Sequence, residues 1–524
     1  MNRLPIELLL QVLCPPTGPP PIGGTTSLRD LKRVAVNQDS VTHYFAVRQV
    51  CRHWRHVLAF PSSLWSTVIL HSRGRQRRRN ELIEYFLSRS GVHLLNVHSD
   101  SFAELEAVAE QSHRLQHLHV SSRESWGVKI NHALEKFRFP APHLEWLECN
   151  ADEPIEDDVP LPLMFAGQTP RLQRLKLCRI PSWGTNQFCN LTHLCIKGWE
   201  YDESGSIRFQ ELLELLRQNS SSLQEVHLSY LDPWIDPLDE PVGALVSDQE
   251  KIKLSGLKRL RLNSLVIPQL ISILTFLCLP HGSALAVTSI RDDNEETNVF
   301  DMFSGRLPQY ENLSDIRTLT INDGARARGC GSSGSLYVDT VEREPLLGFY
   351  NLSHLPFAQV LSELWITDDD CPVEEIDWFS FFASLPVLCK LGLRHVSTRP
   401  ILCALSRTSS PPRFMEFQVL CKSLTSLCLC WDPDMFPDKP NSSYYDLHHC
   451  VETRHRNGHP IHDIRIIPHD DLDRWPSRLL VGLRQYVTTV ELKTRSEGFS
   501  MQVPLESDER VDPKNWPGWG NGTR

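Results

Sequence analysis

The sequence predicts an α/β protein in which a small helical module precedes a long, irregular array of strands and helices. Three observations lead to this fold class: two amphipathic stretches near the start, a short apolar motif that recurs through the rest of the chain, and helical stretches between its copies. Because 524 residues are too many for one hydrophobic core, several domains or a repeat array are expected.

The first amphipathic stretch covers residues 4–13 and reads L-P-I-E-L-L-L-Q-V-L. Pro5 stands at its first helical position, where the missing N–H costs no hydrogen bond. Leu8, Leu9 and Val12 recur at helical spacing and form one apolar face. The stretch is therefore expected to be a helix with one face to cover.

The second amphipathic stretch covers residues 47–57, and the segment F-P-S-S-L-W follows it at 60–65. Val50 and Trp54 lie on one side of the stretch, opposite arginines and histidines. Such a helix needs another element to cover its apolar side.

A six-residue motif recurs beyond residue 90: apolar, two variable, apolar, one variable, apolar. One copy carries no information because leucine is common, but many copies, mostly roughly 20–35 residues apart, indicate a repeat near the period of leucine-rich repeats. The ten clear copies span 115–120, 144–149, 172–177, 191–196, 223–228, 257–262, 316–321, 361–366, 388–393 and 424–429, and two weaker ones span 461–466 and 487–492.

The spacing within the motif predicts a strand. The last two apolar positions are two residues apart, so on a strand they point to the same face. A single such strand cannot bury that face alone, and stacked copies form a continuous core. Helical stretches such as 209–217 and 268–278 are expected to cover the outer side. The body is therefore predicted to be a strand–helix solenoid.

The two N-terminal stretches resemble the F-box, the helical module that binds the Skp-type adaptor of cullin–RING ubiquitin ligases. The degenerate repeats are similar to the bodies of F-box proteins from mushroom-forming fungi, and residues 81–97 resemble the helix, Ser-Gly cap and first strand that follow the F-box there. The insert at 15–44, which begins with a Pro/Gly-rich segment, departs from the family's pattern. This resemblance implies a substrate receptor of an SCF-type ligase, with adaptor and cullin as partners.

The resemblance also implies roles for individual residues. The residues that it implies bind the adaptor are Leu4, Pro5, Leu8, Leu9 and Val12. Those that it implies form the module's own core are Val50, Trp54, Leu64 and Trp65. The expected domains are an F-box-like module at 1–70, a basic linker and first helix at 71–90, a leucine-rich-repeat-like solenoid at 91–495 and a disordered tail at 496–524.

Two other functional classes stay open. One is a repeat scaffold that binds partners without a ligase, which a first helix packed wholly into the body would favour. The other is an enzyme, although the sequence has no nucleophile elbow, Walker loop or H-E-x-x-H motif. We expect no catalytic residues, cofactor or metal.

The chain has no export signal or apolar run long enough to span a membrane, so a cytoplasmic or nuclear protein without a membrane partner is expected. Its fifteen scattered cysteines are then expected to be reduced core residues.

Three further patterns favour ordinary structure over a special site. The segment 329–334 satisfies G-x-G-x-x-G but runs into a strand-like segment, so a flexible loop is preferred to a phosphate site. The six histidines at 448–469 match no zinc spacing and are expected on exposed loops. The arginines at 73–79 favour a solvated linker and helix start over an import signal or a nucleic-acid contact, because no aromatic residues interleave them.

Charge is unevenly distributed along the chain. Residues 1–90 hold 13 Arg and Lys against 5 Asp and Glu, although the whole chain carries −10. Acidic clusters follow three strand-like segments, and loops after equivalent strands should share one rim. Such a rim would steer a basic target protein, against the alternative of solvated loops. Its candidate residues are Asp152, Glu153, Asp157, Asp292, Asp293, Asp368, Asp369 and Asp370.

Overall fold

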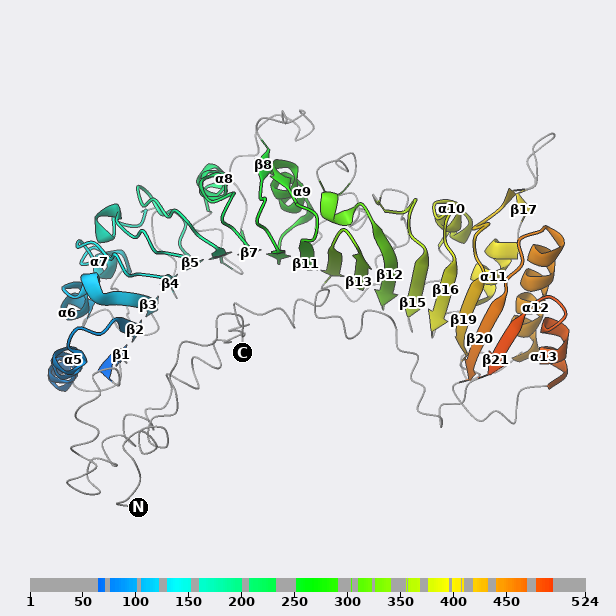
Figure 1. Ribbon diagram of the computed structural model, residues 1–524, viewed down its shortest axis with the longest axis horizontal. Helices are drawn as coiled ribbons and strands as arrows, with labels where there is room; N and C mark the ends of the chain where they lie inside the picture. Colours follow the sequence, from blue (N-terminus) through cyan, green and yellow to red (C-terminus); the bar gives the residue numbers. More distant parts are fainter. Residues whose placement is uncertain are drawn as a thin grey trace, which may run out of the picture. The chain divides into compact units, whose positions relative to one another are not determined.

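The computed structural model of the chain (Figure 1) describes most of the repeat body. The described residues up to 231 belong to one compact unit, unit 1, and those from 251 onward to a second, unit 2. The described ranges are 65–70, 76–100, 105–121, 130–151, 160–199, 207–231, 251–290, 303, 310–322, 326–340, 355, 357–367, 376–394, 398–406, 408–409, 418–431, 440–468 and 477–492.

Unit 1 contains a row of seven strands, each paired in parallel with the next along the chain. In spatial order they are β1 (Thr67–Leu70), β2 (Leu95–Ser99), β3 (Leu115–Ser121), β4 (Trp146–Asn150), β5 (Arg174–Cys178), β6 (His193–Lys197) and β7 (Glu225–Ser229).

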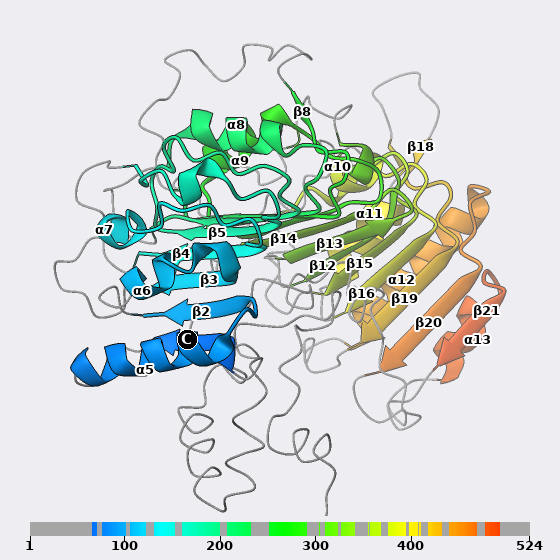
Figure 2. The same cartoon turned by 60° about the vertical axis from the view of Figure 1, so that its left-hand side comes forward.

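The helices of unit 1 lie along one side of this strand row (Figures 1 and 2). Helix α8 buries its leucines. It places Glu211 in its first turn and Arg217 in its last turn, as the helix dipole favours. The helices are α5 (Gln76–Ser90), α6 (Leu105–Ala109), α7 (Ile130–Leu134) and α8 (Phe209–Gln218), with short 3-10 turns η2 (Ser112–Arg114) and η3 (Phe165–Gly167).

Unit 2 contains a row of ten strands, of which all but β13 run parallel. In spatial order they are β9 (Arg259–Asn263), β11 (Ala284–Ile290), β14 (Ser335–Thr340), β13 (Arg326–Gly331), β12 (Ile316–Asn322), β15 (Glu363–Thr367), β16 (Lys390–Arg394), β19 (Ser426–Trp431), β20 (Asp463–Pro468) and β21 (Thr489–Leu492).

Helices and two short strand pairs accompany this row. The helices are α9 (Ile267–Phe276), α10 (Trp378–Ala383), α11 (Thr398–Ser406), α12 (Pro440–Arg456) and α13 (Ser477–Leu483), with the 3-10 turn η6 (Glu311–Leu313). The pairs are β8 (Ile252–Lys253) with β10 (Leu277–Cys278) and β17 (Thr408–Ser409) with β18 (Gln418–Val419). The α/β class predicted from the sequence is thus confirmed.

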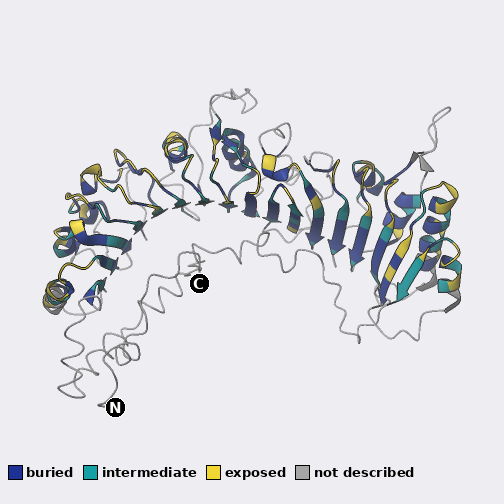
Figure 3. Cartoon of the chain, viewed as in Figure 1, coloured by how far each residue is buried: buried dark blue, intermediate teal, exposed yellow. Residues whose placement is uncertain are grey.

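Each of the twelve motif copies forms a strand, as predicted. In eleven of the copies the last two apolar residues are buried in the core, and Leu118, Val120, Leu147 and Leu175 are at most 1% exposed. In the last copy Val490 and Leu492 of β21 are only half-buried. Half-buried polar residues alternate with them. In Figure 3 the strands are mostly buried or half-buried, and exposed residues gather on helices and turns. The helical covering is less regular than the repeat implies, since the described connection between β5 and β6 has no helix.

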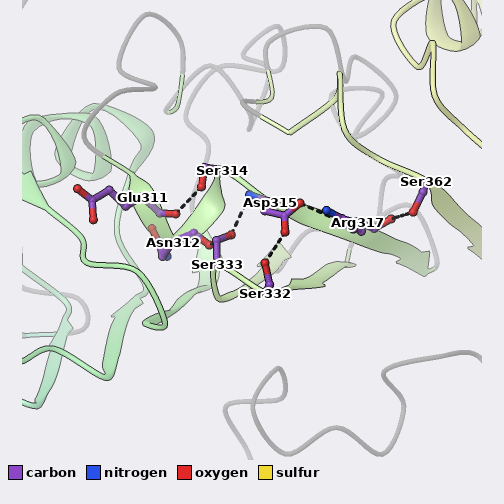
Figure 4. Close-up of polar contacts among 8 residues, drawn as sticks. All are labelled: Glu311, Asn312, Ser314, Asp315, Arg317, Ser332, Ser333 and Ser362. Carbon is purple, nitrogen blue, oxygen red and sulfur yellow. Dashed lines mark hydrogen bonds and ion pairs between the residues drawn. The ribbon is translucent and has the colours of Figure 1, made fainter.

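The expectation of a flexible loop at 329–334 was wrong. The first three of these residues end β13, and a tight turn leads into the antiparallel strand β14. The glycines permit close packing, because a Cβ at Gly331 would lie 1.7 Å from the carbonyl oxygen of Asp315. Figure 4 shows how the turn is held: Ser333 accepts a hydrogen bond from the Asp315 N–H at 2.8 Å and donates to the Asn312 carbonyl at 3.0 Å, while Ser332 donates to the Asp315 carboxylate.

A buried asparagine, Asn219, joins the end of α8 to the preceding turn of unit 1. The Oδ1 atom of Asn219, after α8, accepts a hydrogen bond from the Leu191 N–H at 2.9 Å. Its Nδ2 atom donates to the carbonyls of Phe188 at 2.8 Å and Leu215 at 2.9 Å. Because a buried amide without partners would be costly, this residue fixes the helix end against the preceding turn.

Candidate functional site: the strand face of unit 1

The described residues do not include the expected adaptor-binding set. Leu4, Pro5, Leu8, Leu9 and Val12 lie outside them, as do the module residues Val50, Trp54 and Leu64. These roles stay predictions.

Trp65 is the one described member of the expected module core. It is 2% exposed and packs edge-on against Tyr85 and Phe86 of α5, with ring centroids 5.3 and 5.2 Å apart. Strand β1 begins two residues after it and pairs with β2. The expected module at 1–70 therefore shares its last residues with the sheet of unit 1.

The proposed acidic rim also lies outside the described residues, so it stays a prediction. Its members are Asp152, Glu153, Asp157, Asp292, Asp293, Asp368, Asp369 and Asp370. The strands that precede these clusters are described: β11 and β15 run in the same direction within unit 2, and β4 belongs to unit 1.

The histidine-rich region matches its expected form only in part: His459 and His462 lie in the connection between α12 and β20, and His469 lies outside the described residues. His448, His449 and His455 lie in helix α12 rather than on a loop, because its pattern buries Tyr444, Leu447, Cys450 and Val451 on one face. No group of three metal-ligating side chains occurs within the described ranges. Of the basic run, Arg77–79 belong to α5, and Arg73 and Arg75 lie outside the described part.

The strand face of unit 1, meaning the side chains that alternate with the buried leucines of β2–β7, carries a row of chemically active groups. Strand register sets them directly side by side, one from each of six consecutive strands. The row consists of His98, His119, Glu148, Lys176, Cys195 and His227.

The centre of this row is a buried charge network. The carboxylate of Glu148 lies 3.0 Å from Nδ1 of His119 and 2.8 Å from Nζ of Lys176, and its side chain is 5% exposed. Burial opposes ionisation of Glu148, but the neighbouring His119 and Lys176 outweigh it and lower its pKa. Burial opposes the charge of Lys176 as well, yet Glu148 raises its pKa. Both groups are therefore charged at neutral pH.

The thiols beside this network are unsuited to nucleophilic chemistry. The Sγ atom of Cys195 lies 3.8 Å from Nδ1 of His227, a pairing that could suggest a catalytic dyad. Burial, however, raises the pKa of Cys195, and it raises the pKa of Cys178 to about 11. Protonated buried thiols are inert, so the pair is structural. Twelve cysteines of the described residues are free, and six of these are buried.

Cations held against aromatic rings flank the row. The guanidinium of Arg174 lies 5.7 Å from the ring centroid of Trp146, and Nζ of Lys197 lies 5.0 Å from that of Tyr230. Gly198 lets the backbone of this segment lie close to that of Tyr230, because a Cβ there would lie 1.8 Å from the carbonyl oxygen of Tyr230. These side chains are half-buried. The surface thus offers fixed cations, imidazoles and ring faces, a composition suited to binding.

Sequence reasoning missed this surface although a signal was present. Five of the six row residues occupy the one variable position between the last two apolar residues of the motif. A repeat-by-repeat reading of that position gives His119, Glu148, Lys176, Cys195 and His227. Because strand register is needed to show that they are neighbours, the chain order alone leaves them looking unrelated.

Comparison with protein-family models and with curated proteins gives no match for this chain. Among the helices of the described residues, none is long and apolar enough to cross a lipid bilayer. Function is therefore inferred from the sequence pattern and from the strand face.

Proposed function

We propose that this chain is the substrate receptor of an SCF-type (cullin–RING) ubiquitin ligase. In this proposal the residues up to 70 form an F-box that binds the Skp-type adaptor, and a degenerate leucine-rich-repeat solenoid binds a target protein. The chain itself then performs no catalysis and acts in the cytoplasm, the nucleus or both.

The observation that carries the proposal is the arrangement of the repeat strands. Successive motif copies pair in parallel, and the helices of unit 1 lie on one side. The opposite side displays side chains from six consecutive strands, and extended surfaces of this kind are what repeat proteins use to bind partners. The polar, half-buried composition of the unit 1 strand face suits a protein target.

A second support is the link between the F-box-like sequence and the sheet. Trp65 ends the F-P-S-S-L-W segment and is buried against α5, and β1 begins two residues later. A receptor needs its adaptor-binding module joined to its target-binding body, and this packing joins the end of the segment to unit 1.

A repeat scaffold without ligase function is the second candidate. It has the same strand face and differs only in what residues 4–13 do. The acidic loops, if they share a rim, would steer a basic target by long-range attraction. Binding of such a target should weaken as salt rises, because exposed charges are screened beyond about 8 Å at physiological ionic strength.

The test is affinity purification of the full chain and of the variant Leu8→Asp/Leu9→Asp. Two carboxylates in an apolar interface cost several kcal/mol without a partner. The wild-type chain is expected to co-purify with adaptor and cullin, and the double variant to lose both. Gln11→Asp, on the polar side of the same stretch, is the matched control and should retain them.

Two outcomes would contradict the receptor proposal. If the wild-type chain recovers target proteins but no adaptor or cullin, the scaffold is the better account. If the double variant retains the adaptor as well as the wild type does, residues 4–13 are not an F-box helix. Thermal unfolding of both variants checks that the repeat body remains folded.

A further inference from the structure

The strand face of unit 1 has an uneven balance of fixed charge. Over β4–β7 it carries three cations, Arg174, Lys176 and Lys197, and two carboxylates, Glu148 and Glu225. Glu148 is already shared between Lys176 and His119. The remaining positive charge therefore lies on Arg174 and Lys197.

Neither of these two cations meets a carboxylate within the described ranges. Glu225 lies beside His193, with the atoms Oε2 and Nε2 3.8 Å apart. The contacts of Arg174 and Lys197 are instead the rings of Trp146 and Tyr230. An aromatic ring attracts a cation but offers no oxygen acceptor, so the N–H donors of both groups remain available to oxyanions.

The same face also carries histidines, whose ring N–H groups donate hydrogen bonds even when the ring is neutral. Five histidines lie on strands of unit 1, and all five are half-buried on its strand face: His98, His117, His119, His193 and His227. A further cation–ring contact lies at the carboxyl end of β5, where the guanidinium of Arg179 is 4.6 Å from the ring centroid of Trp199. Cations and imidazoles thus extend across β4–β7 in adjacent register positions.

We propose that the strand face of unit 1 over β4–β7 binds an extended acidic segment of a partner protein. Carboxylates of the segment meet Arg174 and Lys197, and its apolar side chains meet the rings of Trp146 and Tyr230. This inference rests on the proposed function and names the chemistry of the target that the receptor takes. The strand face then prefers a negatively charged partner, whereas the expected acidic loops prefer a positively charged one.

The test measures binding of the full-length chain to a fluorescent Glu-rich peptide and to a Lys-rich peptide of equal length. The variant Arg174→Gln/Lys197→Gln is expected to bind the Glu-rich peptide about tenfold more weakly, because it loses two donors of charge-assisted hydrogen bonds. Arg138→Gln/Arg171→Gln removes the same charge from exposed turns of unit 1 and should bind as the wild type does. Arg174→Lys/Lys197→Arg keeps the charge and should retain most of the affinity.

Three outcomes would overturn the proposal. The first is tighter binding of the Lys-rich peptide, and the second is an equal loss in the control variant, which would indicate a non-specific charge effect. The third is that a single-stranded RNA of equal charge binds more tightly than the Glu-rich peptide and competes with it, which would identify a nucleic-acid surface. None of these outcomes depends on the adaptor, so failure of the acidic-segment proposal is distinguishable from failure of the receptor proposal.

Discussion

The two units contain the same cross-strand ion pair in different surroundings. In unit 1, Glu148 of β4 faces Lys176 of β5 at 2.8 Å, with side chains 5% and 13% exposed. In unit 2, Glu363 of β15 faces Lys390 of β16 at 2.6 Å, with side chains 23% and 33% exposed. Both pairs join residues directly opposite each other on neighbouring strands, and they differ chiefly in how much water reaches them. The pair in unit 1 lies between the last two apolar residues of the motif, and the pair in unit 2 lies two positions earlier.

The neighbours explain the difference. In unit 1 the pair lies among His119, Cys178 and Cys195, so its charges depend on one another for solvation. In unit 2 Trp365 lies beside the pair, donating from Nε1 to Glu363 at 2.7 Å and placing its ring 4.9 Å from Nζ of Lys390. Trp365 also packs with Cys428 and Ile467 into an apolar cluster, and no strand of unit 2 within the described residues contains histidine.

This comparison shows how one repeat scaffold can carry two kinds of surface. The core positions are buried and apolar in both units, and the strand-face positions set the chemistry. Unit 1 uses them for charge and imidazole, and the β15–β20 part of unit 2 uses several of them for an apolar cluster. A charged target segment therefore suits unit 1, and removing the carboxylate of each ion pair should have unequal effects.

The largest effect is expected for Glu148→Gln. Removing one partner of a buried pair leaves Lys176 uncompensated, and such changes cost about 3–5 kcal/mol of unfolding free energy. Denaturant unfolding of the full chain measures the loss. The double variant Glu148→Gln/Lys176→Met should recover a large part of it, and a single variant as stable as the wild type would show that the pair is not buried in solution.

The same pair gives a pH dependence with a definite sign. The folded pKa of Glu148 is lowered, so its contribution is present above the unfolded value of about 4.3 and is lost as pH falls toward the folded value. The folded pKa of Lys176 is raised, so its contribution is present below about 10.4 and is lost above that. Stability measured downward from about pH 5 should fall less steeply in Glu148→Gln than in the wild type. Parallel slopes would contradict this assignment.

An intermediate effect is expected for Gly392→Ala in unit 2. A Cβ at this position would lie 2.1 Å from Cε3 of Trp365, so the ring must move. Overpacking of this kind typically costs about 1–3 kcal/mol. Thermal unfolding together with Trp fluorescence measures both the loss and the ring displacement. Trp365→Leu should relieve the cost of the alanine, and an alanine variant with unchanged stability would mean that the ring is not held over Gly392.

The smallest effect is expected for Glu363→Gln, the counterpart of the first change. Its partner Lys390 is one-third exposed, and pairs open to solvent contribute about 0–1 kcal/mol. Denaturant unfolding under the conditions used for Glu148→Gln gives the comparison directly. A loss as large as that of Glu148→Gln would remove the distinction between the two units.

The leucine motif was enough to locate twelve strands, because period-two burial is a local property of a few residues. Strand β13 escaped this reasoning, since its glycines looked like a loop and are needed instead for packing against Asp315 and Ile316, whereas the segment that forms β14 was expected to be strand-like. Helix α12 was missed because its Pro, Asp and His content hides the apolar positions of Leu447 and Val451. The strand-face row depends on register between distant segments, which the order of residues does not specify.

The most direct test of the receptor account is a bridging measurement. A Skp-type adaptor is immobilised, and the full-length chain and the fluorescent Glu-rich peptide are added together. The peptide should be retained only when the chain is present, and Leu8→Asp/Leu9→Asp should lose both chain and peptide. Arg174→Gln/Lys197→Gln should keep the chain and lose the peptide. A wild-type chain that binds the peptide in solution but is not retained by the adaptor would contradict the account.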